Sequence, residues 1–97
     1  ETGAPGTEGR RTVNHHRRAR LLASKAEWSA FAGNEVRARL LYERAAAHQL
    51  RALFDTLDLY PERRKSAYIL RYLAWQLCVE AGLYELAEVL KAEAKQP

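Results

Sequence analysis

The chain has 97 residues, of which 47% are hydrophobic and 29% are charged, and its formal net charge is +4. This length allows one domain with one small core, and the composition is that of an ordinary globular protein. No run of about 18 apolar residues is present, so we expect no membrane-spanning helix and no membrane partner.

The positive charge is concentrated at the amino-terminal end. Residues 1–20 hold five arginines and two glutamates, whereas residues 21–97 are close to neutral. Residues 1–12 contain three glycines and Pro5 without apolar periodicity, so we expect a disordered lead-in there and a single helical domain over 13–97. Because the chain begins with Glu1 and has no methionine, we expect the natural protein to be longer. Its location stays open, with an intracellular location as the default.

The first predicted helix begins near Thr12 or Asn14, either of which suits the N-cap position, and ends at Gly33. Only its second half is strongly amphipathic, so we expect its arginine-rich first turns to fray. The apolar positions of this helix are Val13, Leu21, Leu22, Trp28 and Phe31.

The second predicted helix begins after Asn34, a favourable N-cap, and continues to about Leu57. It ends over 58–61, because Pro61 disfavours helical geometry in the residue before it. Two rows of apolar residues follow the helical period. The longer row is Val36, Leu40, Ala47, Leu50, Phe54 and Leu57, and the shorter row is Leu41, Ala45 and Ala52.

A third helix is predicted from Pro61, which fits a first turn, to Ala81, with Gly82 after its end. Between residues 67 and 81 only Arg71, Gln76 and Glu80 interrupt the apolar residues, so no continuous polar side remains. Neighbouring helices, a second subunit or a missing segment must therefore cover most of it. A fourth helix is predicted over 83–95.

The two Ala-Gly junctions resemble each other. Residues 32–41 align without gaps to residues 81–90, and Ala38 corresponds to Ala87. A small side chain at this place lets two helix backbones approach closely. We therefore predict an all-α fold of about four helices, arranged as two antiparallel helical hairpins.

Gly82, Tyr84 and Ala87 occupy the spacing found at the turn of tetratricopeptide repeats, and the second hairpin resembles that family of stacked helical hairpins. The first hairpin matches only Gly33 and Ala38. The two turns are 49 residues apart, whereas the family repeats about every 34. The fold expected is thus tetratricopeptide-like or an irregular four-helix bundle.

Catalytic and cofactor signatures are absent from the sequence. There is no phosphate-binding glycine loop, no zinc-type histidine pair and no cysteine pair. We expect His15 and His16 to lie on an exposed cationic helix start, His48 at the edge of the core and Cys78 within it. The sequence predicts a non-catalytic protein with no metal and no cofactor.

The resemblance implies a binding surface for a protein or peptide, because the first helix of each such hairpin lines the inner side. The residues implied are Phe31, Glu27, Ile69, Tyr72, Gln76, Val79 and Glu80. Some members of the family grip a partner's terminal carboxylate with Lys, Arg and Asn. The groove positions here hold Ala23, Glu27, Tyr72 and Gln76, so that clamp is missing. The alternative is that the chain's own first helix covers Ile69, Tyr72 and Val79.

Two other kinds of partner stay open. A basic cluster can bind phosphate with salt-dependent affinity, and the nucleic-acid alternative rests on Arg10, Arg11, Arg17, Arg18, Arg20, Arg63, Arg64 and Lys65. No aromatic residue is interleaved with this basic arm, so stacking on bases is not implied. Self-association is the other candidate, since a homo-oligomer through the third and fourth helices would bury Trp75, Tyr68 or Tyr84.

Overall fold

A computed structural model of the chain describes residues 14–64 and 67–95. This part of the chain forms four α-helices and one short 3-10 helix, and it confirms the all-α fold class. The elements are α2 (His15–Phe31), α3 (Glu35–Leu59), η1 (Pro61–Arg63), α4 (Ala67–Ala81) and α5 (Tyr84–Ala94). The lead-in predicted for residues 1–12 lies outside the described residues.

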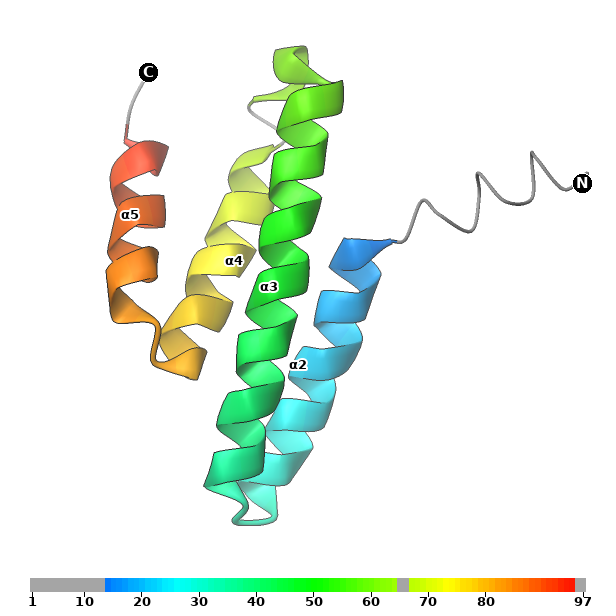
Figure 1. Ribbon diagram of the computed structural model, residues 1–97, viewed down its shortest axis with the longest axis vertical. Coiled ribbons are helices and arrows are strands. Elements are labelled where there is room, and N and C mark those ends of the chain that lie inside the picture. The colour runs from blue at the N-terminus through cyan, green and yellow to red at the C-terminus, as the bar shows by residue number, and fades with distance from the viewer. Residues whose placement is uncertain (1–13, 65–66, 96–97) are drawn as a thin grey trace, which may run out of the picture.

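The four α-helices lie side by side in chain order, and each runs antiparallel to the one before it (Figure 1). Helix α3 packs against α2 along one flank and against α4 along the other, and α5 packs against α4. The Cα atoms extend 46 × 38 × 16 Å, so the molecule is a thin slab with α2 and α5 at its two edges. The α2–α3 and α4–α5 pairs are the two antiparallel hairpins that the sequence predicts.

The two glycine corners have the same backbone geometry. Gly33 and Gly82 have φ angles of 88° and 80°. This conformation is unfavourable for any residue that carries a Cβ atom. In both corners the N–H of the glycine and that of the next residue each bond to a carbonyl of the preceding helix, which is the Schellman motif. These bonds are Gly33 N–H to Ala30 O, Asn34 N–H to Ser29 O, Gly82 N–H to Val79 O and Leu83 N–H to Cys78 O.

Helices α2 and α3 begin where the sequence predicts. The Asn14 side chain accepts a hydrogen bond from the Arg17 N–H at 2.9 Å, and the Asn34 side chain accepts one from the Arg37 N–H at 3.1 Å. The prediction that the third helix begins at Pro61 is wrong, because Pro61 begins η1 and α4 begins at Ala67.

The core of the slab is built largely from alanine. Its small side chains allow the helix axes to approach closely, and the larger residues of the core fill the spaces between them. Ala38 and Ala87, the expected crossing residues, are both buried. The main core cluster contains Ala19, Ala23, Ala45, Ala46, Leu53, Ala67, Ala74, Leu77, Cys78, Ala87 and Leu90.

The longer apolar row of α3 is mostly outside this core. Val36, Leu40 and Phe54 are each more than half exposed, while Leu41 and Ala45 of the shorter row are buried. Helix α3 therefore turns its alanine-containing side toward α2 and α4. Val36, Leu40 and Phe54 are left on the surface, where a monomer gains little from them.

Candidate protein-interaction surface

One side of α4 is left uncovered by the described chain. Ile69, Tyr72, Gln76 and Glu80 recur at spacings of three and four, which places them on one side of the helix. All four are exposed, and the exposed fraction is 67% for Ile69 and 54% for Tyr72. Val79 beside them is half-buried. We call Ile69, Tyr72, Gln76 and Glu80 the open face of α4.

A groove separates α4 from α5 next to this open face. The rings of Tyr72 and Trp75 stack with centroids 5.8 Å apart, and the Tyr68 hydroxyl donates a 2.8 Å hydrogen bond to the Ala94 carbonyl. The groove has a volume of about 230 Å³, and its lining residues are Tyr68, Arg71, Tyr72, Trp75, Leu90, Lys91 and Ala94. We call it the α4–α5 groove. It can accept a large apolar side chain from outside.

Two cations stand in the walls of the α4–α5 groove. Arg71 comes from α4 and Lys91 from α5. The Nε atom of Arg71 is buried and has no hydrogen-bond partner among the described residues. The positive charges of Arg71 and Lys91 in its walls would stabilise a carboxylate that enters the groove.

A second pocket lies on the other flank of α4, where α2, α3 and α4 meet. Tyr42 of α3 lies between Glu27 of α2 and Glu80 of α4, and Gln76 and Arg20 complete the polar lining. Burial raises the pKa of the Tyr42 hydroxyl, and the charges of Glu80 and Glu27 raise this pKa further. We call this site, which has a volume of about 260 Å³, the Tyr42 pocket.

The structure brings most of the residues implied by the resemblance into one region. Glu27, Gln76 and Glu80 share the Tyr42 pocket, and Ile69 and Tyr72 lie further along the same open face of α4. The alternative that α2 covers Ile69, Tyr72 and Val79 is wrong for Ile69 and Tyr72, because both stay exposed. Val79 is half-buried and packs against the core.

Phe31 is not part of this region. It lies at the end of α2, is 84% exposed, and packs edge-to-face on Trp28 with ring centroids 5.9 Å apart. Together with Glu27, these two rings line a separate shallow hollow. Glu27 is therefore the one residue that lines both this hollow and the Tyr42 pocket.

Sequence reasoning missed Tyr42, Arg71 and Lys91 as residues of this surface. Tyr42 is on a helix that the hairpin analogy places behind the inner side, yet it forms the floor between α2 and α4. Arg71 interrupts an otherwise apolar stretch, and this was the signal that could have drawn attention to it. Lys91 gives no signal, since only the packing of α5 on α4 brings it to the groove.

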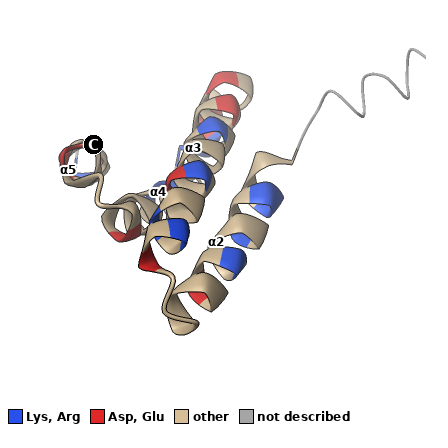
Figure 2. Ribbon diagram, turned by 60° about the horizontal axis from the view of Figure 1, so that its bottom comes forward, with Lys and Arg blue, Asp and Glu red and all other residues tan. Residues whose placement is uncertain are grey.

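The basic residues of the nucleic-acid alternative are in separate places. Arg17, Arg18 and Arg20 are exposed on α2, and Figure 2 shows the basic bands along this helix. Arg63 and Arg64 come after α3, where the Arg63 guanidinium lies 4.5 Å from the centre of the Tyr60 ring. Arg10, Arg11 and Lys65 of this set are outside the described residues.

The expectation that His15 and His16 lie on an exposed face is wrong. Both are half-buried, with His15 Nδ1 lying 2.9 Å from His48 Nδ1 and His16 Nδ1 lying 3.1 Å from Gln49 Oε1. Both rings reach α3, because the first turn of α2 lies beside that helix. These contacts join the first turn of α2, which the sequence led us to expect to fray, to α3.

Cys78 is buried in the core, as expected, and burial raises the pKa of its thiol. Within residues 14–64 and 67–95, no three His, Cys, Asp or Glu side chains gather closely enough to hold a metal ion. In the same residues, no helix has both the length and the apolar character needed to cross a membrane.

We compared the chain with protein-family models, with curated proteins and with solved structures. None of them matches. The tetratricopeptide resemblance therefore stays a prediction that rests on the glycine corners and the alanine crossings.

Proposed function

We propose that this chain is a non-catalytic interaction module, or scaffolding segment, that binds a peptide or helix of a partner protein along the open face of α4. The observation that carries the proposal is the exposure of Ile69, Tyr72 and neighbouring Tyr68 beside a core made largely of alanine. A cluster of large exposed apolar side chains is typical of a binding surface rather than of a monomer's free surface.

The chemistry of the two flanking sites supports a peptide ligand of defined character. The α4–α5 groove offers an aromatic wall with Arg71 and Lys91, which favours an apolar anchor next to an acidic residue. The Tyr42 pocket offers the two acids Glu27 and Glu80 against the one base Arg20, which favours a basic residue further along the peptide. A helix or extended segment that crosses α4 would reach both sites.

A peptide-display selection against the full chain tests this function. We expect enriched peptides to contain an aromatic or large aliphatic residue with an acidic neighbour. Tyr72→Ala should weaken their binding by about tenfold or more, because truncation of an aromatic anchor typically costs about 2 kcal/mol. The thermal midpoint should change little, since Tyr72 is half exposed.

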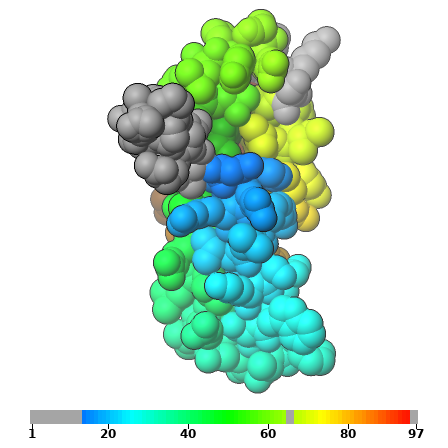
Figure 3. All heavy atoms as spheres, turned by 90° about the vertical axis from the view of Figure 1, so that its right-hand side faces the viewer, coloured from blue at the N-terminus to red at the C-terminus, as the bar shows by residue number. Residues whose placement is uncertain are grey.

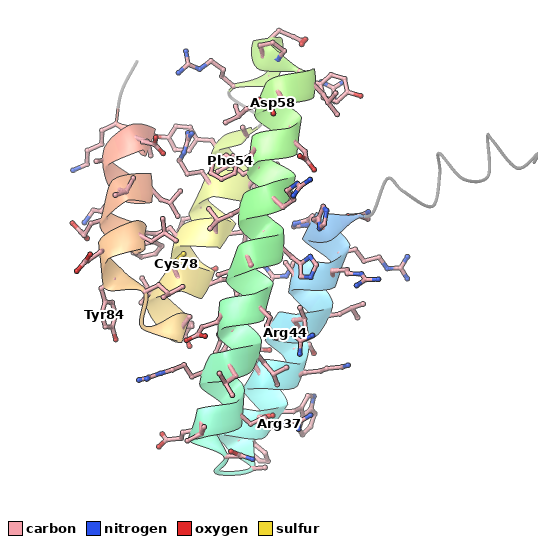
Figure 4. All side chains as sticks on the ribbon, viewed as in Figure 1. Arg37, Arg44, Phe54, Asp58, Cys78 and Tyr84 are labelled. Carbon is pink, nitrogen blue, oxygen red and sulfur yellow. The ribbon has the colours of Figure 1, made fainter. Side chains whose placement is uncertain are left out.

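Tyr84→Ala is the matched control. Tyr84 is the same residue type, is 65% exposed, and lies on α5 outside the α4–α5 groove (Figure 4). Its substitution should leave peptide affinity unchanged. Equal affinity for both variants and the unsubstituted chain, or unfolding of Tyr72→Ala, would refute the site.

Nucleic-acid binding is the second candidate function, and the exposure of Arg17, Arg18 and Arg20 on α2 favours it. This function would use electrostatic contacts to phosphate and would weaken steeply with salt. A filter-binding titration in rising salt separates the two functions, because absence of binding at low salt rules out the second one.

A further inference from the structure

The two edge helices of the slab are each covered on one side only. The buried residues of α2 are Ala19, Ala23 and Ala26, and those of α5 are Ala87 and Leu90. In stacked helical arrays the terminal helices normally carry a polar outer side that ends the array. Each edge of this slab instead carries exposed apolar residues among its charged ones, with Leu21 and Trp28 on α2 and Val89 on α5.

The outer side of α2 carries a regular line of exposed residues. Arg17, Leu21, Ser24, Trp28 and Phe31 follow one another at spacings of four and three, and all are exposed. Leu21 is 57% and Trp28 is 70% exposed. Figure 3, which looks onto this edge, shows α2 in front of the other helices. The line has the spacing of a helix-pairing seam.

The outer side of α5 carries a shorter line with the same spacing. Glu85, Val89 and Ala92 are separated by four and three residues and are all exposed, Val89 by 53%. Small and β-branched side chains on this line leave room for the larger ones of α2. The seam of α5 therefore has a size and spacing that suit the seam of α2.

The charges of the two edges are opposite. Helix α2 carries Arg17, Arg18, Arg20 and Lys25 against the single acid Glu27, whereas α5 carries Glu85, Glu88 and Glu93 against Lys91, and Lys95 follows its end. When the two lines are laid side by side in the same direction, the first three positions of the α2 line each meet one position of the α5 line, whereas Trp28 and Phe31 extend past the end of α5. The layers are Arg17 with Glu85, Leu21 with Val89, and Ser24 with Ala92.

We propose that the occupant of each edge is a second copy of this chain, with α5 of one copy packed in parallel against α2 of the next. The contact is head-to-tail, so one copy offers α5 and its neighbour offers α2, and further copies can add at both ends. It uses neither the open face of α4 nor the α4–α5 groove, so it stands independently of the proposed function.

A mixing experiment with two edge variants tests the contact. Leu21→Asp blocks the α2 edge and Val89→Asp blocks the α5 edge, and both positions are exposed enough to preserve the fold. By sedimentation velocity we expect the unsubstituted chain to exceed the 11.1 kDa monomer increasingly with concentration. Each variant alone should stay monomeric, and a mixture should form a one-to-one dimer through the two intact edges.

Val36→Asp is the control, because Val36 is 74% exposed on α3 and lies outside both seams. It should associate like the unsubstituted chain. A strictly monomeric unsubstituted chain at millimolar concentration would overturn the proposal. Association that persists in Leu21→Asp and Val89→Asp would overturn it too, and would point to a two-fold contact elsewhere.

Charge reversal tests the parallel register. Arg17→Glu and Glu85→Arg should each weaken association by about tenfold or more, because like charges would face each other in one layer. The double variant should restore association by exchanging the two charges. If both single variants weaken association and the double variant does not recover it, the parallel register is wrong.

Discussion

A chain of polar side chains links three helices through residues that the sequence places 33 and 21 positions apart. Gln49 is fully buried, accepts from the His16 ring and donates to the Leu70 carbonyl at 3.4 Å. The His16 Nδ1 atom must carry its proton to serve as this donor. The buried amide therefore has partners from both neighbouring helices, which satisfies it inside an apolar core.

The His15–His48 contact predicts a pH-dependent stability. The pKa of His48 is below its usual value of about 6.5 because of burial, followed by the charges of His15, Arg18 and Arg44. Between this lowered pKa and about pH 6.5, the unfolded chain therefore binds more protons than the folded chain. We expect the free energy of unfolding to keep its full value above about pH 6.5 and to fall as the pH drops from there through the lowered pKa.

Urea unfolding at several pH values between 7 and 5 measures this effect. The variant His48→Gln should flatten the profile, because glutamine keeps a polar side chain without titrating. A profile that is unchanged in His48→Gln would mean that other groups cause the dependence.

At the scale of an element, the glycine corners decide where each hairpin turns. A Cβ at Gly33 would meet no atom within 4 Å, and at Gly82 its nearest neighbour would be Arg39 Nε at 3.8 Å. Space is therefore available at both corners. The requirement for glycine comes from the positive φ angles alone.

Gly33→Ala and Gly82→Ala should each destabilise the protein by about 1–2 kcal/mol, the cost of placing a Cβ in left-handed geometry. Chemical denaturation followed by circular dichroism measures this loss. Gly33→Asn should lose less, because asparagine tolerates this conformation better than alanine. Equal losses for the alanine and asparagine variants would contradict the conformational explanation.

At the scale of the whole molecule, a thin array gives its helices unequal support. Helix α3 has 25 residues and a neighbour on each flank, whereas α5 has 11 residues and packs against α4. A helix of about 11 residues is marginal by itself in water. The stability of α5 therefore depends on one contact surface.

Hydrogen exchange should reveal this difference. In dilute solution we expect the amides of α5 to exchange faster than those in the middle of α3, because α5 can open without global unfolding. At high protein concentration exchange in α5 should slow, as the second copy covers its outer side. Protection of α5 equal to that of α3 in dilute solution would contradict the edge description.

The elements and their ends could be predicted from the sequence because the signals are local. Asn14, Asn34, Gly33 and Gly82 satisfy or terminate backbone hydrogen bonds within a few residues of themselves, so neighbouring residues suffice to locate the caps and corners. The turn before α4 escaped this reasoning, since Pro61 fits a 3-10 turn as well as an α-helix.

The candidate surface could be predicted only in part. The resemblance to stacked hairpins pointed to Ile69, Tyr72, Gln76 and Glu80, but it gave no reason to include Tyr42 or Lys91. These two reach the surface because helices distant in sequence pack beside each other. Periodicity reports which residues share one side of a helix, and it carries no information on which side a neighbour covers.

The sequence by itself determined that this protein is a set of four helices in antiparallel pairs, because period, caps and glycine corners act over one or two turns. Only the tertiary structure decided that the alanine sides of the helices face inward. Close helix approach through small side chains competes with burial of the large ones, and the outcome depends on all neighbouring helices at once. That choice exposes Tyr72, Leu21 and Val89, from which both proposed contacts follow.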